Sequence, residues 1–537
     1  MNDLDTLALR RHARRLLAPW DHATTPGATL GLLQGGALTL HESAGLASIE
    51  HGVAIGPETR FRIASVSKQF TCAAILLLAA EGRLAVTDAI HAHLPELPDF
   101  GAPITIDHLM HNTSGLRDML ELMRLGGADL SQPWAQSDLL AAIGRQRSLN
   151  FAPGSRFRYS NTGFLLLGRI IEAVSGESLA AFLERRIFVP LGMTRTRHTP
   201  STTEIVPHLA TGYLPQGDGF IRAAHGFPLG GEGGLVSCVE DLALWDRNYR
   251  QDLLPGIAEA LQQPQDFTNG RPNLYARGLE VTTYRGLRTV DHGGLWPGFK
   301  TCFLRVPERD LTIIAIANHG GIDVHHLAHQ LLDAAADAPG ARPALHPVPA
   351  MPKLSGLAGR WLDPASGATV EFATDPAPVA TQHGVPFALT PTADGRLAAR
   401  RGVLPFTLGL PEGGPESGPE GGREGDTLVI ETDAGTRTVF HRAPAAPALP
   451  SGLTGDWHCA ELAATWTIAP AAGGLAVQVR GPLTVAGPWP IEPIAAGVLR
   501  IRTPGTLFQG WLDARLEGGT LVVSGARASG LRFERIG

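Results

Sequence analysis

The sequence predicts an α+β domain, in which an antiparallel sheet is flanked by helices, followed by two small antiparallel β-barrels. Strand-like segments occur at both ends of the first 337 residues, with helical segments between them. Two proline-rich linkers follow, and the segments after them open with nearly the same letters. We therefore expect three domains, at residues 1–337, 353–442 and 451–537.

The elements of the first domain follow from hydrophobic periodicity. A hairpin is expected over 28–45, turning at the two glycines 35–36. Apolar residues at helical spacing predict helices over 162–176 and 178–188. Alternating runs predict strands at 279–284, 301–306 and 311–317, and an amphipathic helix over 324–335 closes the domain. Strands from both ends should meet in one sheet.

The remaining chain is organised by its linkers and by a repeat. The linker 338–353 has five prolines in sixteen residues, and a shorter one covers 443–450. After them the chain reads "LSGLAGRW" and "PSGLTGDW", 96 residues apart, followed by short β-branched runs such as "TLVIET" and "VLRIRT". These features predict two related barrels. The acidic, low-complexity stretch 411–426 is expected to be a surface insertion in the first of them.

Composition excludes several classes of partner. With 44% hydrophobic and 18% charged residues the chain should be globular, and a net charge of −6 offers no footprint for nucleic acid or an anionic membrane. The longest apolar run, 72–80, is too short to span a bilayer, and the N-terminal segment is typical of a surface helix rather than a signal peptide. We expect a cytoplasmic protein. Its four scattered cysteines predict buried thiols without a disulfide framework.

A serine and a lysine lie one helical turn apart at the head of the most apolar segment. In "SVSKQF", Ser65 and Lys68 would share a helix face, so the amine can approach the hydroxyl. A lysine acts as a base only when desolvation or a nearby cation lowers its pKa, and the apolar run after Lys68 offers such surroundings. The alternative is a chance spacing with a solvent-exposed lysine. Alone, the Ser-x-x-Lys spacing is weak evidence for a catalytic pair.

Two further motifs lie in the same domain. In "FRYSNTG", Tyr159 can relay a proton and Asn161 can orient a substrate carbonyl or the lysine. In "TVDHGGLW", His292 precedes two glycines; Gly294 would let a substrate approach the strand, and the N–H of Leu295 could donate to an oxyanion. An ordinary buried tyrosine and a glycine-rich turn are the alternatives for each motif in isolation.

The order Ser-x-x-Lys, Tyr-x-Asn, His-x-Gly resembles that of the penicillin-recognising serine hydrolases, which include class C β-lactamases and DD-peptidases. The segments 104–118 and 230–245 are also similar to family segments. Where β-lactamases and DD-peptidases carry a lysine, this chain has His292, mostly neutral at pH 7, which disfavours an anionic substrate. With two barrels after the catalytic domain, the whole chain looks like the bacterial D-aminopeptidases.

This resemblance implies an activity and a β-lactamase-like first domain. The expected reaction releases N-terminal D-residues from small peptides, amides or esters through a serine acyl-enzyme, without a cofactor or metal. In D-aminopeptidases a loop of the last barrel presents a carboxylate to the substrate ammonium; the matching segment here, 481–491, has Gly487 at that position and no acid before Glu492. Trp489 would make the pocket more apolar, or would simply pack inside the barrel.

Alternatives to this activity remain open. One is a broader esterase or amidase of the same family, and another is a non-catalytic penicillin-binding-like module. The triplet His325, His326 and His329 has helical spacing and could share a metal, although a helix surface is the favoured interpretation. A homodimer is one assembly compatible with the sequence.

Overall fold

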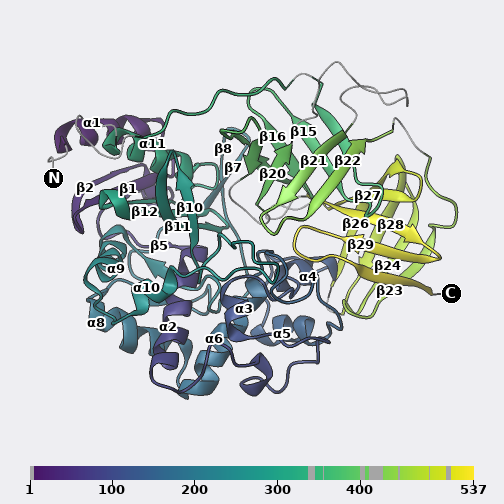
Figure 1. Cartoon of the computed structure of the whole chain (residues 1–537), viewed down its shortest axis with the longest axis horizontal. Helices are drawn as coiled ribbons and strands as arrows, with labels where there is room; N and C mark the ends of the chain where they lie inside the picture. Colours follow the sequence, from purple (N-terminus) through teal and green to yellow (C-terminus); the bar gives the residue numbers. More distant parts are fainter. Residues whose placement is uncertain are drawn as a thin grey trace.

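The structure, a computed structural model, describes residues 5–336, 345–354, 356–399, 405–409, 427–444, 448–482, 484–503 and 510–536. The first domain lies on one side of the molecule, and the two β-domains lie side by side on the other (Figure 1). The predicted insertion 411–426 and part of the first linker fall outside the described residues.

One six-stranded antiparallel sheet forms the frame of the first domain and confirms the predicted α+β class. Its order is β10-β11-β12-β13-β1-β2, so strands from the end of the domain pair with the N-terminal hairpin. The predicted turn at 35–36 joins β1 to β2, with positive φ at both glycines. The strands are β1 (Ala28–Gln34), β2 (Ala37–Ala44), β10 (Glu280–Tyr284), β11 (Leu287–Trp296), β12 (Phe299–Val306) and β13 (Leu311–Ala317).

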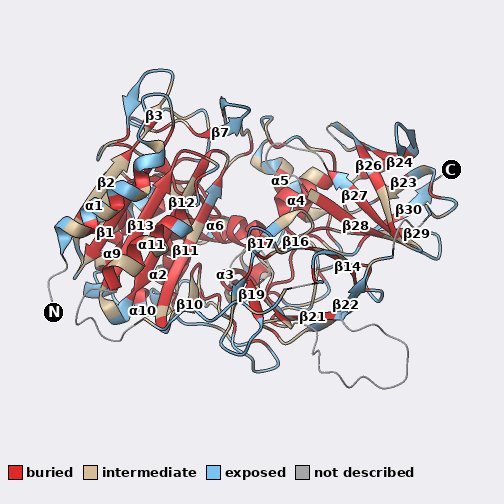
Figure 2. Ribbon diagram, turned by 90° about the horizontal axis from the view of Figure 1, so that it is seen from above, coloured by how far each residue is buried: buried red, intermediate tan, exposed pale blue. Residues whose placement is uncertain are grey.

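Helices cover both faces of this sheet. The N-terminal helix α1 (Thr6–Leu17) and α11 (Val324–Ala336) bury their apolar sides against one face. The other face packs against the main helical core, where Val239 of α9 (Val239–Gln251) approaches Gly31 of β1. Figure 2 shows the central strands β1, β12 and β13 almost wholly buried, while the edge strands β2 and β10 are partly exposed.

The helical core lies between the sheet and the two β-domains. The helix predicted over 162–176 is α6 (Asn161–Ser175). The one predicted over 178–188 is interrupted: α7 (Leu179–Leu183) passes into a π-turn (Glu184–Phe188) before α8 (Val189–Leu191), because Pro190 has no N–H to continue an α-helix. The other helices are α2 (Lys68–Ala80), α3 (Ile106–Met110), α4 (Met119–Leu125), α5 (Gln136–Gly144) and α10 (Ile257–Leu261).

Short strands complete the first domain. They form three small sheets: β3 (Leu46–Ser48) with β4 (Val53–Ala54), β7 (Tyr213–Gln216) with β8 (Gly219–Arg222), and β5 (Phe61–Arg62) with β9 (Leu235–Ser237) and β6 (Arg197–His198). The last of these holds the chain just before the Ser65 turn.

The second domain is a nine-stranded antiparallel sheet around its own core. Its order is β17-β16-β15-β14-β22-β21-β20-β19-β18, and the two edge strands are separated in sequence by a single residue, so the sheet curls almost into a barrel. The strands are β14 (Gly359–Leu362), β15 (Thr369–Ala373), β16 (Val379–Gln382), β17 (Val385–Ala388), β18 (Thr390–Pro391), β19 (Leu397–Ala399), β20 (Phe406–Gly409), β21 (Thr427–Thr432) and β22 (Arg437–Arg442).

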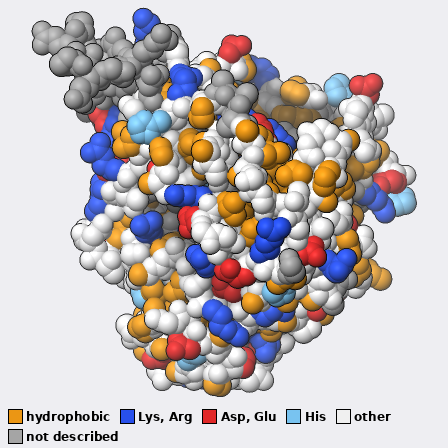
Figure 3. Space-filling model, turned by 90° about the vertical axis from the view of Figure 1, so that its right-hand side faces the viewer, with side chains coloured by type: hydrophobic (Ala, Val, Ile, Leu, Met, Phe, Trp, Pro, Cys, Tyr) orange, Lys and Arg blue, Asp and Glu red, His pale blue; other side chains and the backbone are white. Residues whose placement is uncertain are grey.

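The third domain is a closed eight-stranded barrel, β23 to β30 in sequence order. The strands are β23 (Gly455–Cys459), β24 (Ala464–Ala471), β25 (Gly474–Arg480), β26 (Val485–Ala495), β27 (Val498–Thr503), β28 (Gly510–Glu517), β29 (Thr520–Ser524) and β30 (Leu531–Ile536). Acidic and basic side chains are interspersed over the face of the molecule in Figure 3, in keeping with the absence of a single-sign patch in the sequence.

The repeated opening motif builds the same local structure twice. Trp361 and Trp457 are buried, and each indole N–H donates to the carbonyl four residues earlier, at 3.0 and 2.8 Å. An arginine from the last strand, Arg442 or Arg535, covers each indole and donates to carbonyls of the motif. The two glycines of each copy have matching positive φ, 80° and 124° in one and 80° and 127° in the other. The sequence motif is therefore repeated because both copies form the same local structure around a buried tryptophan.

The barrel is fixed to the first domain by a continuous core and by a clamped turn. One apolar cluster includes residues of α2, α4 and α6 together with the barrel interior, and Figure 2 shows α4 and α5 beside the barrel. The turn 525–530, between β29 and β30, is held by Asn150: its Oδ1 accepts from the N–H and hydroxyl of Ser529 at 2.8 and 3.0 Å, and its Nδ2 donates to the carbonyl of Arg527 at 3.1 Å. Arg158 also donates to the Ser529 hydroxyl, at 2.9 Å.

Removing this clamp should loosen the turn. We expect Asn150→Ala to lower the free energy of unfolding by about 2 kcal/mol, because backbone groups of the turn lose their partners in a partly buried place. Ser529→Ala, which removes one hydroxyl and keeps the backbone bond, should cost less. Urea unfolding followed by tryptophan fluorescence checks this order; equal effects of both changes would contradict it.

Candidate active site

Ser65 lies in a strained turn at the entrance to α2. A short 3₁₀ segment (Ala64–Ser67) joins β5 to α2, and Ala64 has φ of 49°, a left-handed conformation that alanine rarely adopts. Such strain is tolerated where surrounding structure enforces it. The turn leaves Ser65 half-buried at the edge of the apolar helix.

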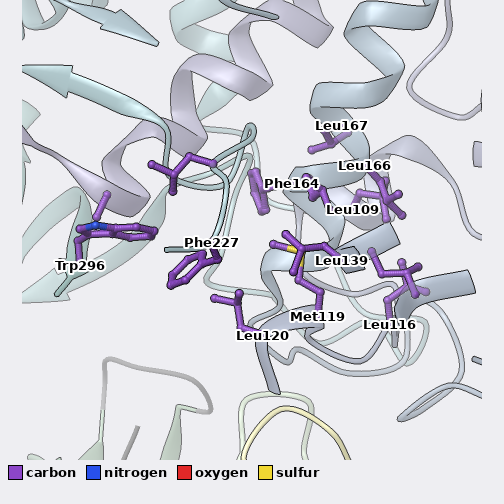
Figure 4. Packing of buried hydrophobic residues seen from close by; sticks show 14 of the residues in the cluster. Leu109, Leu116, Met119, Leu120, Leu139, Phe164, Leu166, Leu167, Phe227 and Trp296 are labelled. Carbon is purple, nitrogen blue, oxygen red and sulfur yellow. The ribbon is translucent and has the colours of Figure 1, made fainter. Parts of the chain in front are cut away.

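Lys68 lies one turn after Ser65, with no exposed surface. Its Nζ is 3.0 Å from Ser65 Oγ, 3.0 Å from Asn161 Oδ1 and 2.6 Å from the carbonyl oxygen of Glu232. The aromatic rings of Tyr159 and Phe164 lie 4.9 and 5.2 Å from the amine. Figure 4 shows Phe164 packed among the leucines of this core. The amine is therefore shielded from water and surrounded by three polar contacts.

The surroundings of Lys68 favour the neutral amine. Burial lowers its pKa to about 7, against the opposing effect of the Glu232 carboxylate, while the cation of Arg527 lowers it further. A neutral amine has two N–H donors and one lone pair. The two carbonyl oxygens can accept only, so the lone pair is left for the Ser65 hydroxyl. This is the arrangement a serine needs to lose its proton.

Tyr159 also lies beside Ser65. Its phenol is close enough to interact with the Ser65 hydroxyl, and burial raises the pKa of Tyr159 well above its ordinary value. A neutral phenol can relay a proton but does not act as a phenolate base. The two groups therefore differ: the Lys68 amine can be neutral near pH 7, whereas the Tyr159 phenol keeps its proton.

Asp118 holds Asn161 in place through its backbone N–H. The Asp118 carboxylate is buried and accepts from the N–H groups of Asn161 at 2.8 Å, Leu120 at 3.0 Å and Glu121 at 3.2 Å. It thereby joins the starts of α4 and α6, and aims the Asn161 amide at Lys68. Asp118 ends the segment 104–118, whose motif indicated the family but not this role.

The strand β11 supplies the third predicted motif. A Cβ on Gly294 would lie 2.3 Å from the carbonyl oxygen of Ile63, so glycine is required where β11 crosses the chain before Ser65. Leu295 follows with its side chain exposed. This crossing brings the segment that carries the Leu295 N–H close to the Ser65 turn.

His292 lies at the back of the site. It is buried, its Nε2 lies 3.0 Å from the hydroxyl of Tyr275, and its ring is 6.1 Å from that of Tyr159. The rings of Tyr159 and Tyr275 meet edge to face at 6.2 Å. The structure thus brings Ser65, Lys68, Tyr159, Asn161 and His292 together.

This geometry agrees with the comparisons with known proteins. A family model described as Beta-lactamase matches residues 9–337, which include every residue of this cluster. The chain belongs to the β-lactamase family. Within that family the Ser65–Lys68 pair lies where nucleophilic serine chemistry is expected.

Relatives and solved structures narrow the comparison within the β-lactamase family. A D-aminopeptidase of Cereibacter sphaeroides is 32% identical over 382 residues, covering 67% of this chain and 70% of that protein. The octameric penicillin-binding protein homologue from Pyrococcus abyssi matches 99% of this chain and 100% of its own at a TM-score of 0.54 and 19% identity. A D-amino acid amidase from Ochrobactrum anthropi SV3 matches 61% and 98%, with a TM-score of 0.52 and 24% identity. The structural matches establish the shared fold.

Within the segment 481–491, Gly487 and Trp489 lie elsewhere than predicted. Trp489 is 4% exposed and packs edge to face on Trp466 at 5.7 Å, inside the barrel. Gly487 lies over the neighbouring strand of the same barrel, at Val477 and Gln478. Both belong to β26, whose ladder with β25 turns the indole inward. The prediction that Gly487 and Trp489 line the pocket is therefore corrected.

The barrel reaches the site with a different turn, 525–530. Arg527 places its guanidinium 5.2 Å from the ring centroid of Tyr159 and 3.6 Å from Asp118 Oδ2. The sequence offered no motif for this turn, "GARASG". Tyr275 was also missed, because it lies in no recognisable pattern. Glu232 lies in the segment 230–245, whose similarity to a family segment gave no sign that its backbone carbonyl would contact Lys68.

Three remaining predictions concern a metal site, disulfides and a membrane-spanning helix. His325, His326 and His329 lie on α11, and within the described ranges no group of three or more histidine, cysteine or acidic side chains could hold a metal. The four cysteines are buried and form no disulfide with one another, as predicted. No helix in the described part of the chain is both long and apolar enough to cross a membrane.

The reactivity of Ser65 should depend on pH through Lys68. Since the pKa of Lys68 is about 7, sulfonylation of Ser65 by phenylmethylsulfonyl fluoride should rise with a midpoint near pH 7 and then level off. Below the midpoint the amine is protonated and cannot accept the serine proton. The rate is measured by intact mass from pH 5 to 10. A midpoint above pH 9, typical of a solvated lysine, would contradict this environment.

Alanine substitutions at Gly293 and Gly294 of β11 give a matched pair of variants. Gly294→Ala should slow this modification about 100-fold, because the new methyl group pushes β11 away from the Ser65 turn by clashing with backbone. The Cβ of Gly293→Ala would instead meet the end of the His325 side chain, which can move, so its effect should stay within a few fold. Rates of Ser65 labelling in the two folded variants check the difference, and equal losses would count against the close approach.

Proposed function

We propose that this protein is a D-stereospecific serine hydrolase that releases N-terminal D-residues from small peptides, amides or esters. The observation that carries the proposal is the buried contact of 3.0 Å between Lys68 Nζ and Ser65 Oγ, with the pKa of Lys68 near 7. The similarity to D-aminopeptidases over 67% of the chain supports the D-residue preference.

Acylation begins with proton transfer. Lys68 takes the proton of Ser65, and the oxygen attacks the carbonyl carbon of the substrate. The N–H groups of Ser65 and Leu295 hold the oxyanion, and Asn161 orients Lys68 and the substrate. Oxyanion donors of this kind typically contribute 10²–10³ in rate.

The leaving amine and the water use the same relay in opposite directions. Tyr159 gives its proton to the leaving nitrogen as it receives the one that Lys68 took from Ser65, and the C–N bond breaks. In deacylation Lys68 and Tyr159 remove a proton from water, whose oxygen attacks the ester; the proton returns to Ser65. His292, bonded to Tyr275, lines the site beside Tyr159. These proposed reaction steps require no metal or cofactor.

A broader esterase or amidase is the second candidate. It is favoured by one observation: the segment 481–491 has no carboxylate, and its Trp489 points into the barrel, so that segment offers nothing to bind an ammonium group. The intact Ser65–Lys68 contact counts against a non-catalytic binding module, since binding alone does not need a base against a nucleophile. The cytoplasmic location and a homodimeric assembly remain predictions.

The stereochemical preference is tested with D-alanine p-nitroanilide and its L-isomer. We expect turnover of the D-form at least 100-fold above the L-form. Ester hydrolysis with no preference between isomers would favour the broader esterase, and absence of any covalent acyl adduct by mass spectrometry would contradict both.

Two variants assign the chemistry. Ser65→Ala should abolish the acyl adduct, and Lys68→Met should lower kcat by about 10³ or more, because the hydroxyl then keeps its proton. Lys353→Met serves as the control, since Lys353 is exposed in the linker and should leave the rate unchanged. An unchanged rate in Lys68→Met would contradict the proposed base.

A further inference from the structure

The barrel places a cation beside the proton relay of the site. Arg527 lies in the turn 525–530, and the backbone of that turn is fixed to the first domain. The Arg527 N–H donates to the carboxylate of Glu121, and its carbonyl accepts from the N–H of Asp118 at 3.2 Å and from Asn150 at 3.1 Å. The position of Arg527 is therefore set by three separate contacts.

The turn can approach this closely because its other residues are small or anchored. A Cβ on Gly525 would lie 2.1 Å from the Glu121 carboxylate, and Ala528 is completely buried. The carbonyl of Ser529 accepts from Arg117 at 3.1 Å, and Arg117 is in turn paired with Glu461 of the barrel at 2.9 Å. Arg527 alone in this turn extends a long side chain toward the catalytic residues.

The guanidinium of Arg527 has unused hydrogen-bonding capacity. Its nearest carboxylate oxygen, on Asp118, is 3.6 Å away, which is too long for a hydrogen bond, and its side chain makes no hydrogen bond to any other described residue. The side chain is 23% exposed. A guanidinium has five N–H donors in a planar fork that matches a carboxylate. Arg527 thus forms an ion pair with Asp118 without donating a hydrogen bond to it, which leaves its N–H donors for another acceptor.

The location indicates which part of a substrate this cation would meet. Its guanidinium lies 5.2 Å from the ring of Tyr159, the residue that we assign to protonating the leaving amine. The leaving-group side of the scissile bond is therefore nearest to Arg527. A positive group there repels an ammonium and attracts a carboxylate.

We propose that Arg527 binds the carboxylate of the leaving group, so that the preferred substrates are short peptides with a free C-terminal carboxylate directly after the scissile bond. This assignment rests on the proposed function for the direction of cleavage. It makes Arg527 a specificity-determining residue supplied by the barrel, and it names the substrate class: dipeptides with an N-terminal D-residue, in preference to their amides.

The test compares D-alanyl-glycine with D-alanyl-glycinamide. Wild-type kcat/KM should favour the acid about tenfold or more, mainly through KM, as expected for a charge-assisted bidentate contact. Arg527→Gln should reduce this ratio about tenfold, and Arg527→Lys should retain part of it. Arg532→Gln is the matched control, since Arg532 is an exposed arginine of the adjoining strand β30 and should keep the wild-type ratio.

The ratio separates specificity from a merely structural role. If Arg527→Gln lowers both rates equally, or if the wild type does not prefer the acid, the assignment is overturned. A purely electrostatic effect on Lys68 would change both substrates alike.

A second measurement does not depend on peptidase activity. Hydrolysis of p-nitrophenyl acetate reports Ser65 chemistry, and N-acetylglycine should inhibit it at least tenfold more strongly than N-acetylglycinamide in the wild type but not in Arg527→Gln. If no D-peptide is cleaved while this difference holds, the proposed function fails and the carboxylate site stands. If the two inhibitors act alike on the wild type, the carboxylate site is rejected whatever the peptidase result.

Discussion

The site depends on keeping the amine of Lys68 out of water. α2 is apolar on all sides, so the lysine at its start has no path to solvent and remains beside Ser65. Two carbonyl oxygens use the two N–H groups of a neutral amine and direct its lone pair to the hydroxyl. The strained Ala64 and the crossing of β11 over Ile63 hold the serine turn beside that lone pair.

The barrel completes this environment rather than merely following it in the chain. Asp118 joins the starts of two helices of the first domain and forms an ion pair with Arg527 of the barrel. The positive charge of Arg527 also lowers the pKa of Lys68. Because the apolar core is continuous between the two parts, the turn 525–530 is held at a fixed distance from the relay. The charge of Arg527 also bears on the sequence-based inference from His292, which disfavoured anionic substrates: a cation for a carboxylate comes from the barrel instead.

Much of this could be predicted from the sequence because motifs in short segments report local geometry. The spacing of Ser65 and Lys68 fixes their separation on one turn, and alternating runs fixed the strands of the sheet and both β-domains. The contact between the barrel and the site could not be predicted, because it joins residues more than 360 apart along the chain. Trp489 was chosen by its likeness to a family loop, but its place in the barrel ladder turns it inward; the turn that does reach the site contains small residues and a single arginine, which carry no pattern.

The two β-domains share one local arrangement, in which an arginine of the last strand covers the buried indole of Trp361 or Trp457. In each copy the last hairpin points to the first domain: Asp433, in the turn after β21, borders a pocket with Tyr275, while Arg527 faces Tyr159. The two tyrosines, which meet edge to face, therefore have an acidic residue nearby from one β-domain and a basic residue from the other. Substitutions in these two turns change the side chains beside the two tyrosines and leave the buried tryptophans that organise each β-domain in place.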